Sequence, residues 1–183
     1  AFWYLEKENS RKVKLINEMK GSYLGGEFDQ KEIEKELNLI GANFKKYNYD
    51  EIIEHTSDFI SKEKAVGWFQ GRMEFGPRAL GARSILADPR SDKMQKNLNL
   101  KVKYRESFRP FAPAILKDEL SNWFEMDTES PYMLLVSNIK KEKKIQMTDQ
   151  QKNLFGIKKL NIKRSEVPAI THVDYSARIQ TVN

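Results

Sequence analysis

Apolar residues recur every three or four positions over residues 33–40, which is the spacing of one face of a helix. Asp29 and Glu32 stand at capping-box spacing before this stripe, and a glycine follows it as a stop signal. A second stripe over residues 51–63, opened by Asp50, predicts another helix of similar length. The first third of the chain is therefore expected to be largely helical.

Short apolar runs further along the chain predict β-strands. They lie at residues 65–69, 111–116, 132–136, 167–174 and 177–182, with a weaker candidate at 44–49. The first of these runs reads as a buried strand, and the last two are expected to be neighbours in a sheet.

Polar segments separate these runs. Ser91 is placed to cap a third helix that reaches about Val102, and residues 140–164 are expected to form a solvated excursion. Because helices and strands are interspersed, the predicted class is α/β (α+β) with a mixed, twisted β-sheet flanked by helices.

The loop after residues 65–69 concentrates glycine, proline and arginine. Glycines allow sharp turns and close approach to a ligand, and arginines present planar forks that suit phosphate or carboxylate oxygens. Residues 71–109 hold ten basic and four acidic residues, a net charge of +6 that equals the formal charge of the whole chain. The pattern predicts an anion-binding site in this segment.

The composition limits the number of domains and the kinds of site that the chain can hold. The 183 residues suit one domain with a real core. The absence of cysteine excludes disulfides, thiolate catalysis and cysteine metal sites, and two histidines make a histidine-rich metal site improbable. We expect His55 to be an ordinary surface histidine of the second helix. The sequence lacks a run long enough to cross a bilayer and a recognisable signal peptide, so a cytoplasmic protein is the default expectation.

Residues 71–90 (GRMEFGPRALGARSILADPR) resemble the NodU/CmcH carbamoyltransferase family. The resemblance continues through residues 105–113, 130–133, 168–174 and 177–182. It covers roughly residues 20–183 and implies a YrdC-like C-terminal domain over 21–183. Residues 1–20 would then be a segment that packs on a missing partner domain.

The resemblance implies a two-step reaction. ATP, with or without Mg²⁺, and carbamoyl phosphate would form carbamoyl-adenylate in this domain, and the carbamoyl group would pass to a hydroxyl in an N-terminal, actin-like domain. That domain and its metal ligands are expected to lie outside this chain, as is the family's final C-terminal segment. The fragment alone is therefore expected to be incomplete for transfer.

Basic residues at the family's motif positions are the candidate phosphate cradle. Lys103 and Arg109 are the candidate catalytic residues, because fixed cations neutralise charge with little reorganisation. The candidate substrate- and ATP-phosphate-binding residues are Arg72, Arg78, Arg105, Arg178, Ser84 and His172.

Each candidate also has a purely structural interpretation. Arg83 and Arg90 have Glu74 and Asp88 as plausible ion-pair partners, and the Ser84 hydroxyl can bond its own turn. His172 and Asp174 alternate on the expected strand and would share one side of it. A hydrogen-bonded core pair is then an alternative to ligand contact.

Two other functions stay open on the sequence. A pI near 9.3 and a basic segment would also suit an RNA-binding module. Against it, the sequence lacks regularly spaced aromatic residues on a basic surface. The second alternative is a structural or regulatory domain that has lost activity. An orphaned interface on residues 1–20 would favour self-association into a homo-oligomer, and no membrane partner is expected.

Overall fold

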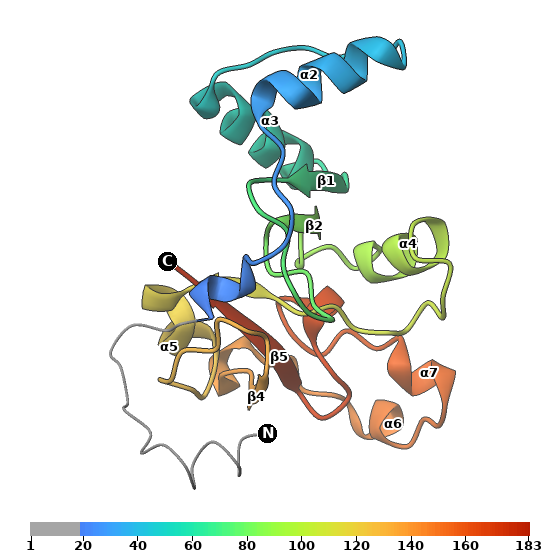
Figure 1. Ribbon diagram of the computed structural model, residues 1–183. Helices are drawn as coiled ribbons and strands as arrows, with labels where there is room; N and C mark the ends of the chain where they lie inside the picture. The colour runs from blue at the N-terminus through green and yellow to red at the C-terminus, as the bar shows by residue number, and fades with distance from the viewer. Residues whose placement is uncertain (1–18) are drawn as a thin grey trace, which may run out of the picture.

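The computed structural model describes residues 19–183, so the expectations for residues 1–18 lie outside the described range. The first elements are η1 (Lys20–Ser22), α2 (Gln30–Leu39), α3 (Tyr49–Ser61), β1 (Val66–Phe69), β2 (Arg83–Leu86), α4 (Met94–Lys101) and β3 (Ala114–Leu116). They are followed by η2 (Lys117–Glu119), α5 (Leu120–Trp123), β4 (Leu135–Asn138), η3 (Lys141–Lys143), α6 (Asp149–Lys152), α7 (Ile157–Leu160), η4 (Pro168–Ile170) and β5 (Ser176–Val182). The predicted mixed α/β class is confirmed: helices flank one antiparallel and one mixed sheet (Figure 1).

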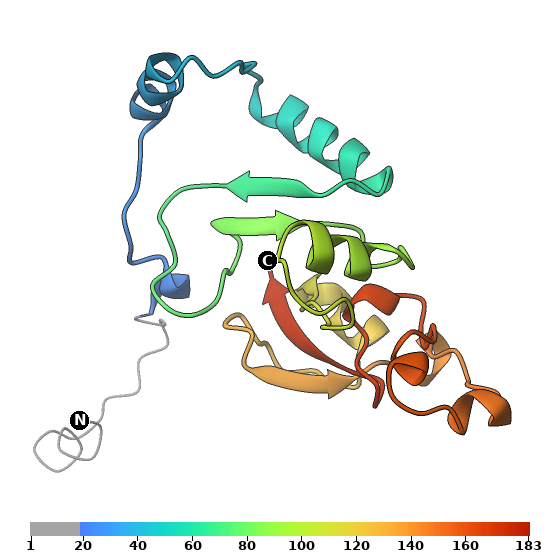
Figure 2. The ribbon, with the colours of Figure 1, turned by 90° about the vertical axis from the view of Figure 1, so that its right-hand side faces the viewer.

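The main hydrophobic core is built around β5, the middle strand of a three-stranded sheet with the order β3-β5-β4. This strand pairs in parallel with β3 and antiparallel with β4, so both of its edges are hydrogen-bonded. Figure 2 shows β4 beside it. Its Ala177 and Ile179 are fully buried. The cluster around them consists of Leu120, Phe124, Ile139, Val167, Ile170, Ala177 and Ile179.

The part of the molecule around this core is called the body below. A second part, the arm, projects from it and consists of α2, α3 and the β1–β2 hairpin (Figure 1). The hairpin is antiparallel, with Val66 opposite Leu86 and Phe69 opposite Arg83. Neither α2 nor α3 contains a buried residue. Leu39 and Ile40 at the end of α2 are 75% and 73% exposed. The arm therefore depends on local interactions more than on a core.

Both helices of the arm begin with the expected kind of signal. Asp29 accepts a hydrogen bond from the Glu32 backbone N–H at 2.8 Å, and Glu32 accepts one from the Asp29 N–H, which confirms the predicted capping box. The second helix starts earlier than predicted. Asn48 is its cap, through a 2.9 Å bond from the Glu51 N–H, and Asp50 lies inside the first turn.

The strand predictions needed several corrections. The strand predicted at residues 44–49 is absent: residues 44–48 form an irregular connection between α2 and α3, and Tyr49 begins α3. The strand at Val66–Phe69 exists but is half exposed, since α3 covers it from one side (Figure 2). No strand was predicted at β2, because its four residues, Arg83-Ser-Ile-Leu86, show no apolar–polar alternation.

Near the core, two further segments differ from the strand predictions. The run at 132–136 becomes β4 only from Leu135, because the chain turns at Met133, where φ is +55°. The run at 167–174 is not a strand: it contains η4, and the Val167 N–H bonds the Ser165 hydroxyl instead of a sheet partner. The predicted partner of β5 is thus replaced by β3 and β4.

Two polar segments also differ in part from what the sequence predicted. Ser91 does not cap α4: its hydroxyl accepts from the Lys93 N–H at 3.3 Å, and the helix begins at Met94. The excursion at 140–164 is largely exposed as expected and holds three short helices, but Arg164 at its end is buried, only 6% exposed. Among the described residues, no helix has both the length and the apolar character that crossing a membrane requires.

Candidate functional site

The loop between β1 and β2 is shaped by one carboxylate. Glu74 Oε1 accepts hydrogen bonds from the backbone N–H groups of Leu80, Ala82 and Arg83 at 2.7, 2.8 and 3.3 Å. Burial acts to raise the pKa of Glu74, but these backbone hydrogen bonds together outweigh it and lower the pKa. Glu74 therefore stays ionised and holds the loop closed.

Arg83 is a structural residue of the same loop. Its guanidinium lies 3.4 Å from the centre of the Phe69 ring and donates to the carbonyl oxygens of Gln70 and Gly71, each at 3.0 Å. Glu74 receives the backbone N–H of Arg83 and makes no side-chain ion pair with it among the described residues. The structural interpretation of Arg83 is supported, with carbonyl groups in place of the expected carboxylates.

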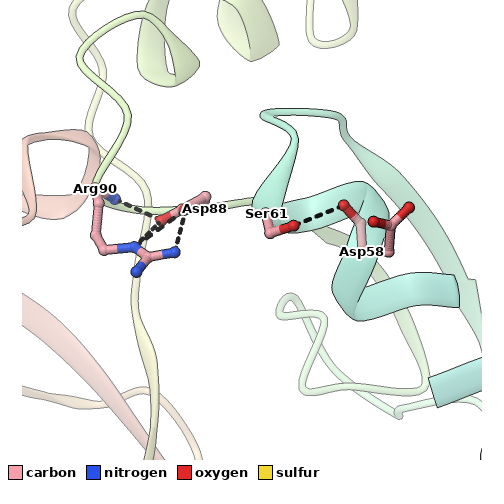
Figure 3. A network of polar contacts seen from close by, with 4 residues as sticks. All are labelled: Asp58, Ser61, Asp88 and Arg90. Carbon is pink, nitrogen blue, oxygen red and sulfur yellow. Dashed lines mark hydrogen bonds and ion pairs between the residues drawn. The ribbon is translucent and has the colours of Figure 1, made fainter. Parts of the chain in front are cut away.

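Arg90 forms the ion pair that the sequence suggested. Its Nε and Nη2 reach the two carboxylate oxygens of Asp88 at 2.9 and 2.7 Å, as Figure 3 shows. These bonds from Arg90 are the main cause of the lowered pKa of Asp88. Arg90 is thus occupied by this ion pair within the fold.

Figure 3 also shows a local hydrogen bond at the end of α3, in which the Ser61 hydroxyl donates to the Asp58 carbonyl at 2.8 Å.

Arg178 on β5 has a different environment. It lines a hollow of about 190 Å³ together with His172 and with Val136 of the neighbouring strand β4. Pro110, Phe111 and Ala112 form the rest of the wall. Within the described part of the chain its Nε is buried without a hydrogen-bond partner, and it makes no ion pair with a carboxylate.

Arg78 from the glycine-rich loop lies close enough to influence Arg178 electrostatically. Burial lowers the pKa of Arg178, and the positive charge of Arg78 lowers it further. Like charges repel, and a bound anion would relieve that repulsion. The structure thus brings Arg178 and His172 to one hollow, while Arg78 acts on Arg178 from the glycine-rich loop.

The turn at residues 103–111 is held by a buried asparagine that the sequence analysis overlooked. Asn99, which is fully buried in α4, donates to the carbonyls of Ser107 and Arg109 at 3.1 and 2.8 Å. Its Oδ1 accepts from Arg105 Nε at 2.6 Å. A polar residue between Met94 and Val102 on the expected inner face of this helix was the available signal.

The turn carries three of the candidate site residues, Arg105, Arg109 and Lys103, and their surroundings differ. The Arg105 guanidinium lies 5.0 Å from the centre of the Phe111 ring, which lines the hollow of Arg178. Arg109 is half exposed and pairs with Glu106 at 2.8 Å. Lys103 is exposed. None of these three residues lines the hollow of Arg178 itself, whose wall begins at Pro110; Arg105 is connected to it through Phe111, and Arg109 precedes Pro110 in the chain.

The remaining candidates lie in or near the β1–β2 loop. Arg72 and Arg78 are exposed, and Arg78 lines a second hollow of about 260 Å³ with Glu74 and Arg83. Ser84 Oγ accepts a hydrogen bond from the Gly81 N–H at 3.1 Å, so it bonds its own turn.

The prediction that His172 and Asp174 alternate on a strand is wrong, because neither residue lies in a strand; hydrogen bonds link them through Ser176. The His172 Nδ1 lies 2.9 Å from the Ser176 hydroxyl, which donates to Asp174 Oδ1 at 2.7 Å. Burial lowers the pKa of His172, Asp174 opposes this effect and Arg178 adds to it. His55, by contrast, is exposed on α3 beside Tyr47, which confirms it as a surface histidine.

Potential metal ligands are dispersed in the described region. Residues 19–183 contain no group of three or more histidine, aspartate or glutamate side chains arranged to hold a metal ion.

Comparison with known proteins identifies the class. The family model for the carbamoyltransferase C-terminus matches residues 57–183, and the chain belongs to this family. The uncharacterized protein sll1178 of Synechocystis is 50% identical over 185 residues, which cover the whole chain and 30% of that protein. Nodulation protein NolO of Bradyrhizobium diazoefficiens is 39% identical over 153 residues, 82% of this chain and 24% of the relative.

One relative carries a named activity. The 3'-hydroxymethylcephem-O-carbamoyltransferase of Streptomyces clavuligerus is 39% identical over 126 residues, which cover 69% of this chain and 20% of that enzyme. The chain therefore spans less than a third of the length of each of these relatives. The family resemblance inferred from the motifs is confirmed.

Proposed function

We propose that this chain is the part of an O-carbamoyltransferase that binds ATP and carbamoyl phosphate and forms carbamoyl-adenylate. Water releases inorganic phosphate from carbamoyl phosphate, and the carbamate oxygen displaces pyrophosphate from the α-phosphorus of ATP. Family membership supports the transferase class. The observation that carries the ligand assignment is the position of Arg178, which lines a hollow and whose side chain has no hydrogen-bond partner or ion pair among the described residues. The positive charge of Arg78 in the glycine-rich loop acts on this guanidinium. An anion between them would satisfy both guanidinium groups.

The chemistry requires such a site. A triphosphate and a second phosphate-bearing anion must approach each other, and fixed guanidinium groups neutralise that charge without reorganising. In this proposal Arg78 and Arg178 grip phosphate oxygens, and Arg105 and Arg109 extend the positive wall along the turn. Lys103, Arg72 and Ser84 would contact ligand at its edges, and Mg²⁺ would accompany the ATP phosphates.

The proposal assigns the second step to another domain. The carbamoyl group would pass to a substrate hydroxyl in an N-terminal, actin-like domain of the same protein, which would also hold the transfer-domain metal. The exposed apolar side chains of the arm support a large partner surface, because Leu39 and Ile40 lie in solvent at the end of α2.

Calorimetric titration tests the anion site. ATP with and without Mg²⁺, and carbamoyl phosphate, would be titrated into the wild type and into the Arg178→Gln and Arg78→Gln variants. We expect each variant to lose about 2–5 kcal/mol of binding free energy, since a charge-assisted contact in a partly buried site is removed. Arg90→Gln is the matched control, because Arg90 belongs to the same motif but pairs with Asp88.

The alternative outcomes are distinct. Equal loss in the Arg90 variant would show that general positive charge, not this site, binds the ligand. Tight, salt-dependent binding of long RNA with indifference to ATP would reject the proposal in favour of a nucleic-acid-binding module.

A further inference from the structure

The hydrogen bonds around Ser176 fix the direction in which protons point. The Ser176 hydroxyl lies 2.7 Å from Asp174 Oδ1 and 2.9 Å from His172 Nδ1. A hydroxyl has one proton to donate, and an ionised carboxylate can only accept. The hydrogen bond from Ser176 lowers the pKa of Asp174, so this carboxylate is ionised at neutral pH. The hydroxyl must therefore donate to Asp174 and accept from His172.

This direction sets the tautomer of the histidine. Nδ1 must carry the proton that the Ser176 oxygen accepts, which leaves Nε2 of a neutral imidazole with a free lone pair. Among the described residues, His172 Nε2 has no hydrogen-bond partner. The backbone also holds these two residues together, since the His172 N–H donates to the Ser176 carbonyl at 2.8 Å.

The histidine lies beside a cation. His172 lines the hollow whose charged wall residue is Arg178, and the positive charge of Arg78 acts on Arg178. His172 also lines a second hollow with Lys159 and Asp174. The buried Arg164 donates through Nε to the His172 carbonyl at 3.3 Å. A ligand in the hollow of Arg178 would meet a guanidinium donor beside the imidazole ring.

We propose that His172 Nε2 accepts a hydrogen bond from an amino group of the ligand whose anionic end Arg178 and Arg78 hold. This inference rests on the proposed function. The amino group is the amide –NH₂ of carbamoyl phosphate, and the adenine amino group of ATP is the other source of the same donor. His172 thereby discriminates a carbamoyl group from an acyl group of the same shape.

The tautomer can be read directly. Nitrogen-15 NMR of the imidazole rings distinguishes an Nδ1–H from an Nε2–H tautomer, and the chain has two histidines. His55, exposed on α3, serves as the internal reference. We expect His172 to be the Nδ1–H form at neutral pH. An Nε2–H form or a charged ring would overturn the proposal.

The ligand preference is tested with an isosteric pair. Acetyl phosphate carries a methyl group where carbamoyl phosphate carries –NH₂. We expect the wild type to bind carbamoyl phosphate at least about tenfold more tightly, because a site built for a donor rejects the analogue that lacks it. His172→Phe should bind the two phosphates alike, and His172→Gln, which keeps an acceptor oxygen, should recover part of the preference. His55→Phe is the matched control and should behave as the wild type.

These measurements distinguish a failure of the anion site from a failure of the role proposed for His172. Binding of neither acyl phosphate by the wild type would reject the anion site itself. Binding of both equally would leave that site standing and overturn the role of His172. If the preference is absent but His172→Phe weakens ATP and not a triphosphate without a base, the amino group is that of adenine, and the assignment to carbamoyl phosphate is wrong.

Discussion

A single carboxylate, Glu74, organises the loop that carries the family's longest motif. It satisfies the backbone N–H groups of Leu80 and Ala82, both in residues that are at most 5% exposed. Buried donors that lose their acceptor are costly. The glutamate in this motif is therefore best explained as the residue that shapes the loop and not as a catalytic base.

Glu74→Ala should destabilise the protein by roughly 2–4 kcal/mol, because two buried N–H groups lose their acceptor. Chemical denaturation would measure the change. Glu54→Ala is the control, since Glu54 is exposed on α3, and it should stay within about 0.5 kcal/mol of the wild type. A similar small effect of both substitutions would contradict the role assigned to Glu74.

Acidification should weaken the fold in two windows. Burial lowers the pKa of His172; Asp174 opposes this effect and Arg178 adds to it, and Arg164 and Lys159 are the other cations near the ring. The unfolded chain then takes up a proton first as the pH falls below about 6.5. Stability is therefore complete above that pH and declines below it.

The second window belongs to the carboxylates with lowered pKa, namely Glu74, Asp88 and Asp174. Their contribution is present above about pH 4 and is lost as the pH falls through their folded-state values. Urea denaturation at a series of pH values would measure both windows. His172→Phe should abolish the first one, and a stability that does not change between about pH 7 and 5 would argue against it.

At the scale of elements, the arm and the body differ in how they are stabilised. Capping boxes at Asp29 and Asn48 secure α2 and α3, whereas neither helix buries a residue. The strand β5 has hydrogen-bonded neighbours on both edges and a buried inner face. Local helices without a core open more easily than central strands.

Hydrogen exchange should follow this division. We expect amides of α2 and α3 to exchange faster than those of β5 around Ile179. Asn48→Ala should cost about 1 kcal/mol of local helix stability and accelerate exchange in α3 without affecting β5. Simultaneous acceleration in both regions would mean that arm and body unfold as one unit.

At the scale of the whole molecule, the main core lies around β5, a smaller cluster contains Met94 and Leu98, and the large apolar side chains of the arm are exposed or only partly buried. Ile179 is fully buried, whereas Ile40 is 73% exposed. The energetic weight of a residue follows its burial, because only buried methylene groups leave a cavity when removed.

Ile179→Ala should therefore destabilise the chain by about 2–4 kcal/mol, and Ile40→Ala by no more than about 0.5 kcal/mol. Thermal or chemical denaturation would compare this matched pair. A comparable loss at Ile40 would show that α2 packs against part of the protein in solution.

The sequence by itself determined what depends on neighbours along the chain. The cap at Asp29, the concentration of positive charge in residues 71–109 and the family motif all follow from local order. Even the missed cap at Asn48 is a local signal two residues from the predicted one.

Only the tertiary structure decided which of the arginines remain available. Arg83 and Arg90 are occupied by Phe69 and Asp88, whereas the Arg178 side chain has no hydrogen bond or ion pair among the described residues. The fold likewise set the strand partners of β5 and the hydrogen bonds that link His172 to Asp174 through Ser176. The physical reason is that ion pairing, burial and tautomer depend on groups that are close in space, and residue spacing along the chain does not specify them.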